Sequence, residues 1–224
     1  MIEKERQVLV ILPHPDDEAF GISGTLATHI KQGTPVTYAC LTLGEMGRNL
    51  GNPPFATRES LPKIRKKELL ASAQAIGIKD LRMLGFRDKT VEFEDEEKLA
   101  DLFSNMIDEL NPSLVITFYP GYSVHPDHEA TGRAVVRAVK RIPKEKRPKL
   151  HCIAFSNNCE EELGQPDIVH HIHDSVKEKL GSMGAHRSQT GFFFDEMVKR
   201  YEQGDPDTVK RVEIERFWSY KWDD

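Results

Sequence analysis

The chain has 224 residues, of which 38% are hydrophobic and 30% charged, so we expect a folded protein rather than a disordered one. Its formal net charge of −5 argues against nucleic acid as the main partner. No apolar stretch approaches the ~20 residues of a membrane-spanning helix. With no signal-peptide pattern, no CxxC motif and three scattered cysteines, we expect a cytoplasmic protein with reduced thiols. The length fits a single α/β domain over residues 1–224.

Strand-like and helix-like segments alternate over most of the chain. Residues 7–12 are an apolar run stopped by Pro13, which is typical of a strand buried on both faces. The other predicted strands are 36–43, 81–86, 113–118 and 150–155, and the predicted helices are 16–31, 64–76, 94–110 and 128–140. This alternation favours an α/β fold with three layers and a mainly parallel sheet.

Two further regions are less regular. The segment 44–54 is rich in glycine and proline, and its length suggests a functional loop because compact domains keep few long irregular segments. In the last third of the chain, the predicted elements are a strand at 168–173, helices at 175–185 and 196–202, and a late strand at 211–222.

The first predicted strand is followed by His14-Pro15-Asp16-Asp17-Glu18. Imidazole and carboxylate are good ligands for divalent metals, and the tight turn between His14 and Asp17 can direct both side chains to one point. Asp16 must then point elsewhere, and a carboxylate beside a metal is a natural general base. The plainer alternative is that an aspartate here only caps the following helix.

A second motif, His125-Pro126-Asp127-His128, follows another predicted strand. Because ligands bind beyond the carboxyl ends of parallel strands, both motifs can meet in one crevice. His128 could complete a metal site with His14 and Asp17, while Asp127 could orient His125 through its carboxylate. A protonated His125 could stabilise a developing oxyanion. The alternative is a capped helix start with surface histidines.

Other residue groups give weaker signals. The cluster of His170, His171 and His173 could bind a second metal, but surface or inter-subunit hydrogen bonding is the favoured interpretation. Arg58 and Arg65 follow the 44–54 loop and are our candidates for binding a substrate carboxylate.

The two motifs resemble the signatures of the LmbE-like (PIG-L) zinc-dependent N-acetylglucosaminyl deacetylases. Further matches are Gly44-Glu45, the Arg65 to Glu68 segment and Ala185-His186-Arg187-Ser188-Gln189. Within the family, the length and the 44–54 loop are most similar to the deacetylases of bacillithiol biosynthesis, which act on N-acetylglucosaminyl-malate. Some relatives carry a tyrosine where Ser123 stands here, so a tyrosine at the oxyanion is in question.

The resemblance implies a Rossmann-like fold, a Zn²⁺ ion held by His14, Asp17 and His128, and Asp16 as general base. It further implies that His125 stabilises the oxyanion, with Asp127 tuning it, and that the chain forms a homo-oligomer, a trimer or a hexamer. Other first-row divalent ions could replace zinc. The expected partner is a small amino-sugar substrate. The alternatives are an amidase for a thiol-sugar conjugate and a non-catalytic metal- or sugar-binding module.

Overall fold

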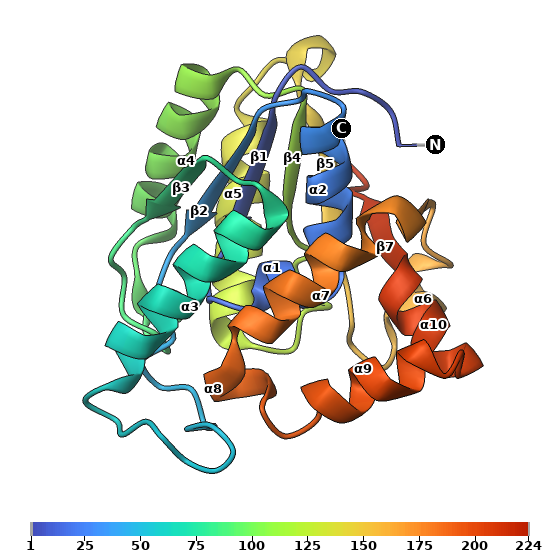
Figure 1. Cartoon of the computed structure of the whole chain (residues 1–224). Coiled ribbons are helices and arrows are strands. Elements are labelled where there is room, and N and C mark those ends of the chain that lie inside the picture. Colours follow the sequence, from blue (N-terminus) through green and yellow to red (C-terminus); the bar gives the residue numbers. More distant parts are fainter. Residues whose placement is uncertain (1, 224) are drawn as a thin grey trace.

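A seven-stranded sheet organises residues 2–223, the part of the chain that the computed structural model describes (Figure 1). The strand order is β3-β2-β1-β4-β5-β7-β6. The strands are β1 (Val8–Leu12), β2 (Val36–Cys40), β3 (Asp80–Met83), β4 (Leu114–Phe118), β5 (Lys149–Ile153), β6 (Ile168–His171) and β7 (Ile214–Ser219). The first five strands run parallel, and β7 pairs antiparallel with both β5 and β6.

Helices cover both faces of this sheet. The long helices are α2 (Ser23–Lys31), α3 (Leu61–Ile76), α4 (Glu96–Leu110), α5 (Pro126–Lys140) and α7 (Val176–Ala185). Along β1, Leu9 and Ile11 pack in one hydrophobic cluster with residues of α4 and α5, whereas Val10 and Leu12 pack in another with residues of α2 and α3. This alternation follows from the opposite faces that successive strand residues present. The predicted three-layer α/β fold is confirmed.

Several further elements complete the fold. They are the α-helices α1 (Asp17–Gly21), α6 (Cys159–Leu163), α8 (Arg187–Thr190), α9 (Phe194–Glu202) and α10 (Pro206–Glu213), and 3₁₀ turns at Val91–Phe93, Lys144–Lys146 and His173–Ser175. No helix within residues 2–223 is long and apolar enough to cross a membrane.

Two predicted elements need correction. The helix expected at 16–31 is broken at Ile22, whose φ of −142° is not helical, so α1 and α2 are separate. The strand expected at 211–222 is wrong at its start, because α10 runs to Glu213 before β7 begins. Asp205 begins α10 by accepting the Thr208 N–H, a capping contact that favours a helix here. The helices α6, α8 and α10 were not predicted.

The order of the strands places the two motifs together. From β1 the chain proceeds outward to β2 and β3, then returns to β4 on the other side of β1, where Val8 pairs with both Val36 and Leu114. This reversal is the topological switch point at which α/β proteins bind ligands. His14 and His125 follow the carboxyl ends of the adjacent strands β1 and β4, and so reach the same crevice.

Candidate active site

The three residues predicted to bind a metal are in mutual contact. His14 Nδ1 lies 3.1 Å from His128 Nε2, Asp17 Oδ1 lies 3.3 Å from His128 Nε2, and Asp17 Oδ2 lies 3.5 Å from His14 Nδ1. Zinc–nitrogen bonds of about 2.0–2.1 Å place the corners of a tetrahedral donor set about 3.4 Å apart. The spacing and the chemistry of this donor set therefore fit a divalent metal ion.

The rest of each imidazole ring is held in place. His128 Nδ1 lies 3.1 Å from the Ser123 carbonyl oxygen, and its ring stacks on Phe118 with 4.0 Å between the ring centroids. His14 Nε2 lies 3.1 Å from Asp127 Oδ2 and 3.2 Å from Asp88 Oδ1. These contacts suit an N–H donated away from the centre, which leaves His14 Nδ1 and His128 Nε2 as metal-binding atoms.

Asp127 contacts a different histidine from the one we predicted. Its carboxylate meets His14, and only its backbone N–H meets His125, donating to Nδ1 at 3.2 Å. The reason is its place in the first turn of α5, where its fully buried side chain lies within hydrogen-bond distance of His14. Asp127 Oδ2 also accepts the Lys89 N–H at 2.7 Å. The carboxylate contact that we assigned to His125 thus falls on His14.

Asp88 is a site residue that our sequence reasoning missed. It follows β3 and is only 4% exposed. Together with His14 and Asp127 it forms a group that could hold a metal ion, with ligand atoms within 4.8 Å of one another. Its other oxygen accepts the Met46 N–H at 2.8 Å, and so ties the 44–54 loop to the site. Its position after a neighbouring parallel strand was the signal that could have identified it.

Asp16 lines the same cleft as the proposed ligands, and its carboxylate pairs with Arg65. Its φ of 94° is left-handed, a strained conformation for a residue with a side chain. Arg65 Nη2 lies 2.9 Å from Asp16 Oδ2 and also donates to the Pro15 carbonyl oxygen. Burial raises the pKa of Asp16, although the Arg65 charge opposes this shift. A carboxylate held in this way suits a general base.

A buried polar network lies behind this turn, and Glu18 is at its centre. Its carboxylate accepts hydrogen bonds from the Asp16 N–H at 3.0 Å and the Tyr38 hydroxyl at 3.1 Å. The other oxygen contacts Ser72 Oγ at 2.5 Å and His186 Nε2 at 2.7 Å. Glu18 and His186 are both fully buried. Both residues belong to sequence motifs of the family, but the sequence alone did not predict a role for either of them.

His125 lies at the N-terminus of α5, at the edge of the same cluster. Its ring centroid is 4.8 Å from that of His14 and 5.1 Å from that of His128. These three histidines form another group whose ring nitrogens lie close enough together to hold a metal ion. Burial and the two neighbouring imidazoles lower the pKa of His125. Tyr122, which directly precedes Ser123, donates a hydrogen bond from its hydroxyl to Glu162 at 2.9 Å.

These residues line an open cleft of about 300 Å³. Its lining consists of His14, Asp16, Asp17, Met46, Gly47, Arg48, Arg65, Asp88, Lys89, His125 and His128. Arg48 and Lys89 are its exposed cations. Arg65 is only 3% exposed, and its guanidinium binds Asp16 and backbone carbonyls. Arg58 is exposed and donates to the Gly47 carbonyl, outside the described lining.

The His170 cluster does not come together around one point. His170 Nδ1 contacts the Thr25 hydroxyl at 3.0 Å, whereas His173 Nδ1 pairs with Glu213 Oε2 at 2.6 Å. Among the residues described, the groups that could hold a metal all include His14. The contacts made by His170 and His173 therefore agree with hydrogen bonding, the interpretation that we favoured.

Comparison with known proteins now defines the class. The family model described as GlcNAc-PI de-N-acetylase (PIG-L) matches residues 9–139, and the chain belongs to this family. The match includes both histidine motifs. The predicted family resemblance is confirmed.

Much more similar relatives are found within the bacilli. The chain is 54% identical over 219 residues to a Bacillus cereus protein named "Probable N-acetyl-alpha-D-glucosaminyl L-malate deacetylase 2", covering 98% of this chain and all of that one. A Bacillus subtilis protein of the same name is 50% identical over 220 residues, with 98% and 100% covered.

Solved structures share the fold at lower identity. An N,N'-diacetylchitobiose deacetylase from Pyrococcus horikoshii has a TM-score of 0.71 at 24% identity, covering 96% of this chain and 84% of that one. A 4-carboxy-2-hydroxymuconate hydratase from Pseudomonas putida has a TM-score of 0.73 at 18% identity, with 97% of each chain covered. Because a deacetylase and a hydratase share this fold, function must be argued from the site.

Proposed function

We propose that this protein hydrolyses the N-acetyl group of N-acetyl-α-D-glucosaminyl L-malate, giving acetate and the free amine, in bacillithiol biosynthesis. The observation that carries the proposal is the contact triangle of His14, Asp17 and His128, with a separate carboxylate, Asp16, beside it. The names of the bacillus relatives support the substrate. A module that only binds metal or sugar would not need Asp16 beside the ligands.

We propose zinc as the metal, held by His14 Nδ1, His128 Nε2 and the Asp17 carboxylate. A zinc ion in such a site polarises a carbonyl and lowers the pKa of water towards ~7. Three protein ligands leave a position open, as catalytic zinc sites require. Asp88 and Asp127 fix the His14 ring so that Nδ1 faces the ion.

Protein side chains then transfer protons and stabilise the oxyanion. Asp16 takes a proton from the attacking water and delivers it to the amide nitrogen as the C–N bond breaks. His125 donates a hydrogen bond to the oxyanion through Nε2, because its Nδ1 already accepts the Asp127 N–H. This arrangement lets a neutral His125 act as donor, where we had predicted a protonated ring. Arg65 keeps Asp16 oriented, and its positive charge opposes the rise that burial causes in the pKa of Asp16.

The malate carboxylates need cations at the cleft. We propose that Arg48 and Lys89, both exposed and in the lining, attract them. Arg58, our candidate from the sequence, donates to the carbonyl oxygen of Gly47, which lines the cleft, and remains part of the proposal as a rim contact. The buried Arg65, our other candidate, acts through Asp16 and the loop carbonyls in this proposal.

Acetate release from N-acetylglucosaminyl-malate by the zinc-loaded protein tests this function. We expect rapid release, its loss after chelation, and its recovery on adding zinc. A folded, zinc-loaded protein that releases no acetate would contradict the substrate assignment.

One observation favours an amidase for a larger acyl group as second candidate. A pocket of about 420 Å³ shares the lining residues Asp17 and His128 with the cleft. Its other walls include the rings of Phe20, Phe118 and Phe155. Comparing acetyl with longer acyl groups on the same amino sugar separates the two: faster hydrolysis of the longer groups would favour the amidase.

Three further expectations stay predictions. The trimer or hexamer, the cytoplasmic location and the lack of a nucleic-acid partner each follow from the sequence or the resemblance. Sedimentation analysis of the purified protein would test the assembly.

A further inference from the structure

The loop from β4 to α5 contains a strained residue directly before His125. Val124 has a left-handed φ of 65°, and it is 69% exposed. A left-handed φ is uncommon for residues other than glycine, and for a β-branched residue it is an outlier because Cβ is forced against the backbone. The exposed side chain gains little from burial, so contacts made by its neighbours hold Val124 in this conformation.

The two neighbours of Val124 are joined by a hydrogen bond across it. The His125 N–H donates to the Ser123 carbonyl oxygen at 2.7 Å, which closes a γ-turn centred on Val124. With a positive φ at its centre, this is the rarer and more strained form of the γ-turn. The same Ser123 oxygen lies 3.1 Å from His128 Nδ1. One carbonyl group therefore contacts both the proposed oxyanion donor, His125, and a proposed metal ligand, His128.

Glu129, in the first turn of α5, holds this γ-turn in place. Its Oε1 accepts hydrogen bonds from the Ser123 N–H at 2.8 Å and from the Ser123 hydroxyl at 2.7 Å, and its Oε2 accepts the Gly121 N–H. Ser123 is fully buried, so removing the acceptor would leave its polar groups unsatisfied. The carboxylate thus fixes the backbone immediately before the strained residue.

A valine at this position restricts the turn to a single geometry. Glycine adopts a left-handed conformation readily, but it would also leave the turn free to adopt several others. A β-branched residue has far fewer conformations, so a valine that Glu129 holds in place makes the turn rigid. Strain that is held by its surroundings is common at functional sites. Here it fixes the His125 imidazole before substrate binds, as a preorganised donor to an oxyanion requires.

We propose that Val124 and Glu129 are positioning residues for His125 and His128. Glu129 holds the γ-turn against the strain at Val124, and the turn orients both imidazoles. The effects on turnover and on zinc affinity rest on the proposed function. The coupling between Val124 and Glu129 in the stability of the metal-free protein does not depend on it.

Thermal melting of the metal-free protein tests this coupling. Val124→Gly should raise Tm by about 2–4 °C, because relief of the strain exceeds the entropy that glycine adds to the unfolded chain. Glu129→Gln should lower Tm, since an amide has a single acceptor oxygen for donors that now contact both carboxylate oxygens. In the Val124→Gly background, Glu129→Gln should lower Tm by at most about half as much, because the strain that Glu129 opposes is gone.

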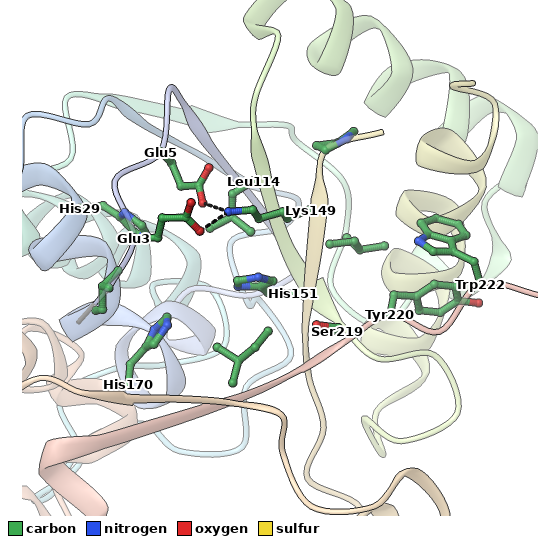
Figure 2. A pocket seen from close by; sticks show the side chains of 14 residues that line it. Glu3, Glu5, His29, Leu114, Lys149, His151, His170, Ser219, Tyr220 and Trp222 are labelled. Atoms are coloured by element: carbon green, nitrogen blue, oxygen red, sulfur yellow. Dashed lines mark hydrogen bonds and ion pairs between the residues drawn. The ribbon is translucent and has the colours of Figure 1, made fainter. Parts of the chain in front are cut away.

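Glu5→Gln is the matched control for Glu129→Gln. Glu5 also accepts a serine hydroxyl next to β4, from Ser113 at 2.6 Å, but before the start of the strand instead of after its end. Figure 2 shows Glu5 paired with Lys149, the first residue of β5, so the control lies at the end of the sheet opposite to the catalytic cleft. Glu5→Gln should change Tm equally with and without Val124→Gly.

Zinc affinity and turnover test the effect on the two histidines. Competition with a chromophoric chelator should show about 10–100-fold weaker zinc binding by Glu129→Gln, because the Ser123 carbonyl no longer orients His128. Val124→Gly should keep its zinc affinity, since Glu129 still holds Ser123. At equal zinc occupancy, Val124→Gly should lose about 10–100-fold in kcat on N-acetylglucosaminyl-malate with KM little changed. A more stable but slower enzyme is a result that a purely structural role of Val124 would not give.

Three results would overturn the proposal. A lower Tm of Val124→Gly would show that the valine is not strained, and additive Tm changes in the double variant would show that Glu129 does not act on the strain. Wild-type zinc affinity in Glu129→Gln together with wild-type kcat in Val124→Gly would show that the turn does not orient the imidazoles. If the wild type itself releases no acetate, the deacetylase proposal fails, while the Tm coupling still decides this one.

Discussion

Glu18 Oε2 accepts the backbone N–H of Asp16 at 3.0 Å. This hydrogen bond closes a turn in which Asp16 has a left-handed φ of 94°. An aspartate costs about 1–2 kcal/mol more in this conformation than in a right-handed one, so the surrounding structure must hold it there. Glu18 thus determines where the proposed general base points, and the buried His186 holds Glu18 in turn.

We predict that Glu18→Gln lowers kcat by about 10–100-fold and changes KM little, because a small displacement of a catalytic group is costly. An amide has only one acceptor oxygen for the contacts that the carboxylate now makes. Steady-state kinetics on the zinc-loaded variant measures the effect. Glu215→Gln is the matched control, since Glu215 is a buried carboxylate that accepts the Gly24 and Thr25 N–H groups away from Asp16. Equal losses in both variants would point to general destabilisation.

Asp88→Asn should weaken zinc binding by about 10–100-fold, as the loss of a partner that orients a metal-binding histidine typically does. The amide can no longer hold His14 Nε2–H as a carboxylate does at 3.2 Å. Competition with a chromophoric chelator measures the affinity. Unchanged zinc affinity would show that Asp127 alone suffices to orient the ring.

Arg48→Ala and Lys89→Ala should each raise KM for N-acetylglucosaminyl-malate several-fold with kcat little changed, because each removes a cation from the cleft. For a methyl N-acetylglucosaminide, which lacks the carboxylates, KM should stay near the wild-type value. Arg58→Ala on the same two substrates tests the rim position. If all three variants behave alike on both substrates, the carboxylates are bound elsewhere.

The stability of the fold should fall in mild acid because of His29. Its pKa is about 4 in the folded state, against an ordinary value of 6.5, since burial disfavours the charged ring. The unfolded chain therefore binds more protons between these values, and the free energy of unfolding falls as the pH drops from 6.5 to 4. At about 1.4 kcal/mol per pKa unit, the loss is about 3 kcal/mol, and none occurs above this window.

Urea denaturation at pH 7 and pH 5 would measure this loss, with His29→Leu as the comparison. Other groups titrate equally in both proteins, so the variant should lose less stability than the wild type between the two pH values. A wild type and a variant with the same pH dependence would contradict the assignment to His29.

The centre of the sheet could be predicted because Val8–Leu12 and Leu114–Phe118 are short, largely apolar runs with a proline close after them. The break at Ile22 was not predicted, although Gly21, a poor helix former, directly precedes it. The C-terminal α10 was missed because its β-branched residues favour strands locally, while Asp205 and tertiary contacts favour a helix.

Some residues of the site could likewise be predicted from the sequence, and others could not. The proximity of His14, Asp17 and His128 could be predicted because their motifs follow the ends of adjacent parallel strands. Asp88 is a lone aspartate in a loop, and only the pairing of β2 with β3 brings it near His14. The contact between Asp127 and His14 depends on side-chain direction at the start of α5, which spacing does not specify.

The most direct test of the account compares acetate release by the wild type and Asp16→Asn at equal, measured zinc occupancy. We predict that the variant retains its zinc and loses about 10²–10⁴-fold in kcat, because the ligands are intact and the base is gone. A zinc-loaded Asp16→Asn with near wild-type turnover would contradict the assignment of the base. It would also remove the main reason for regarding this site as built for hydrolysis.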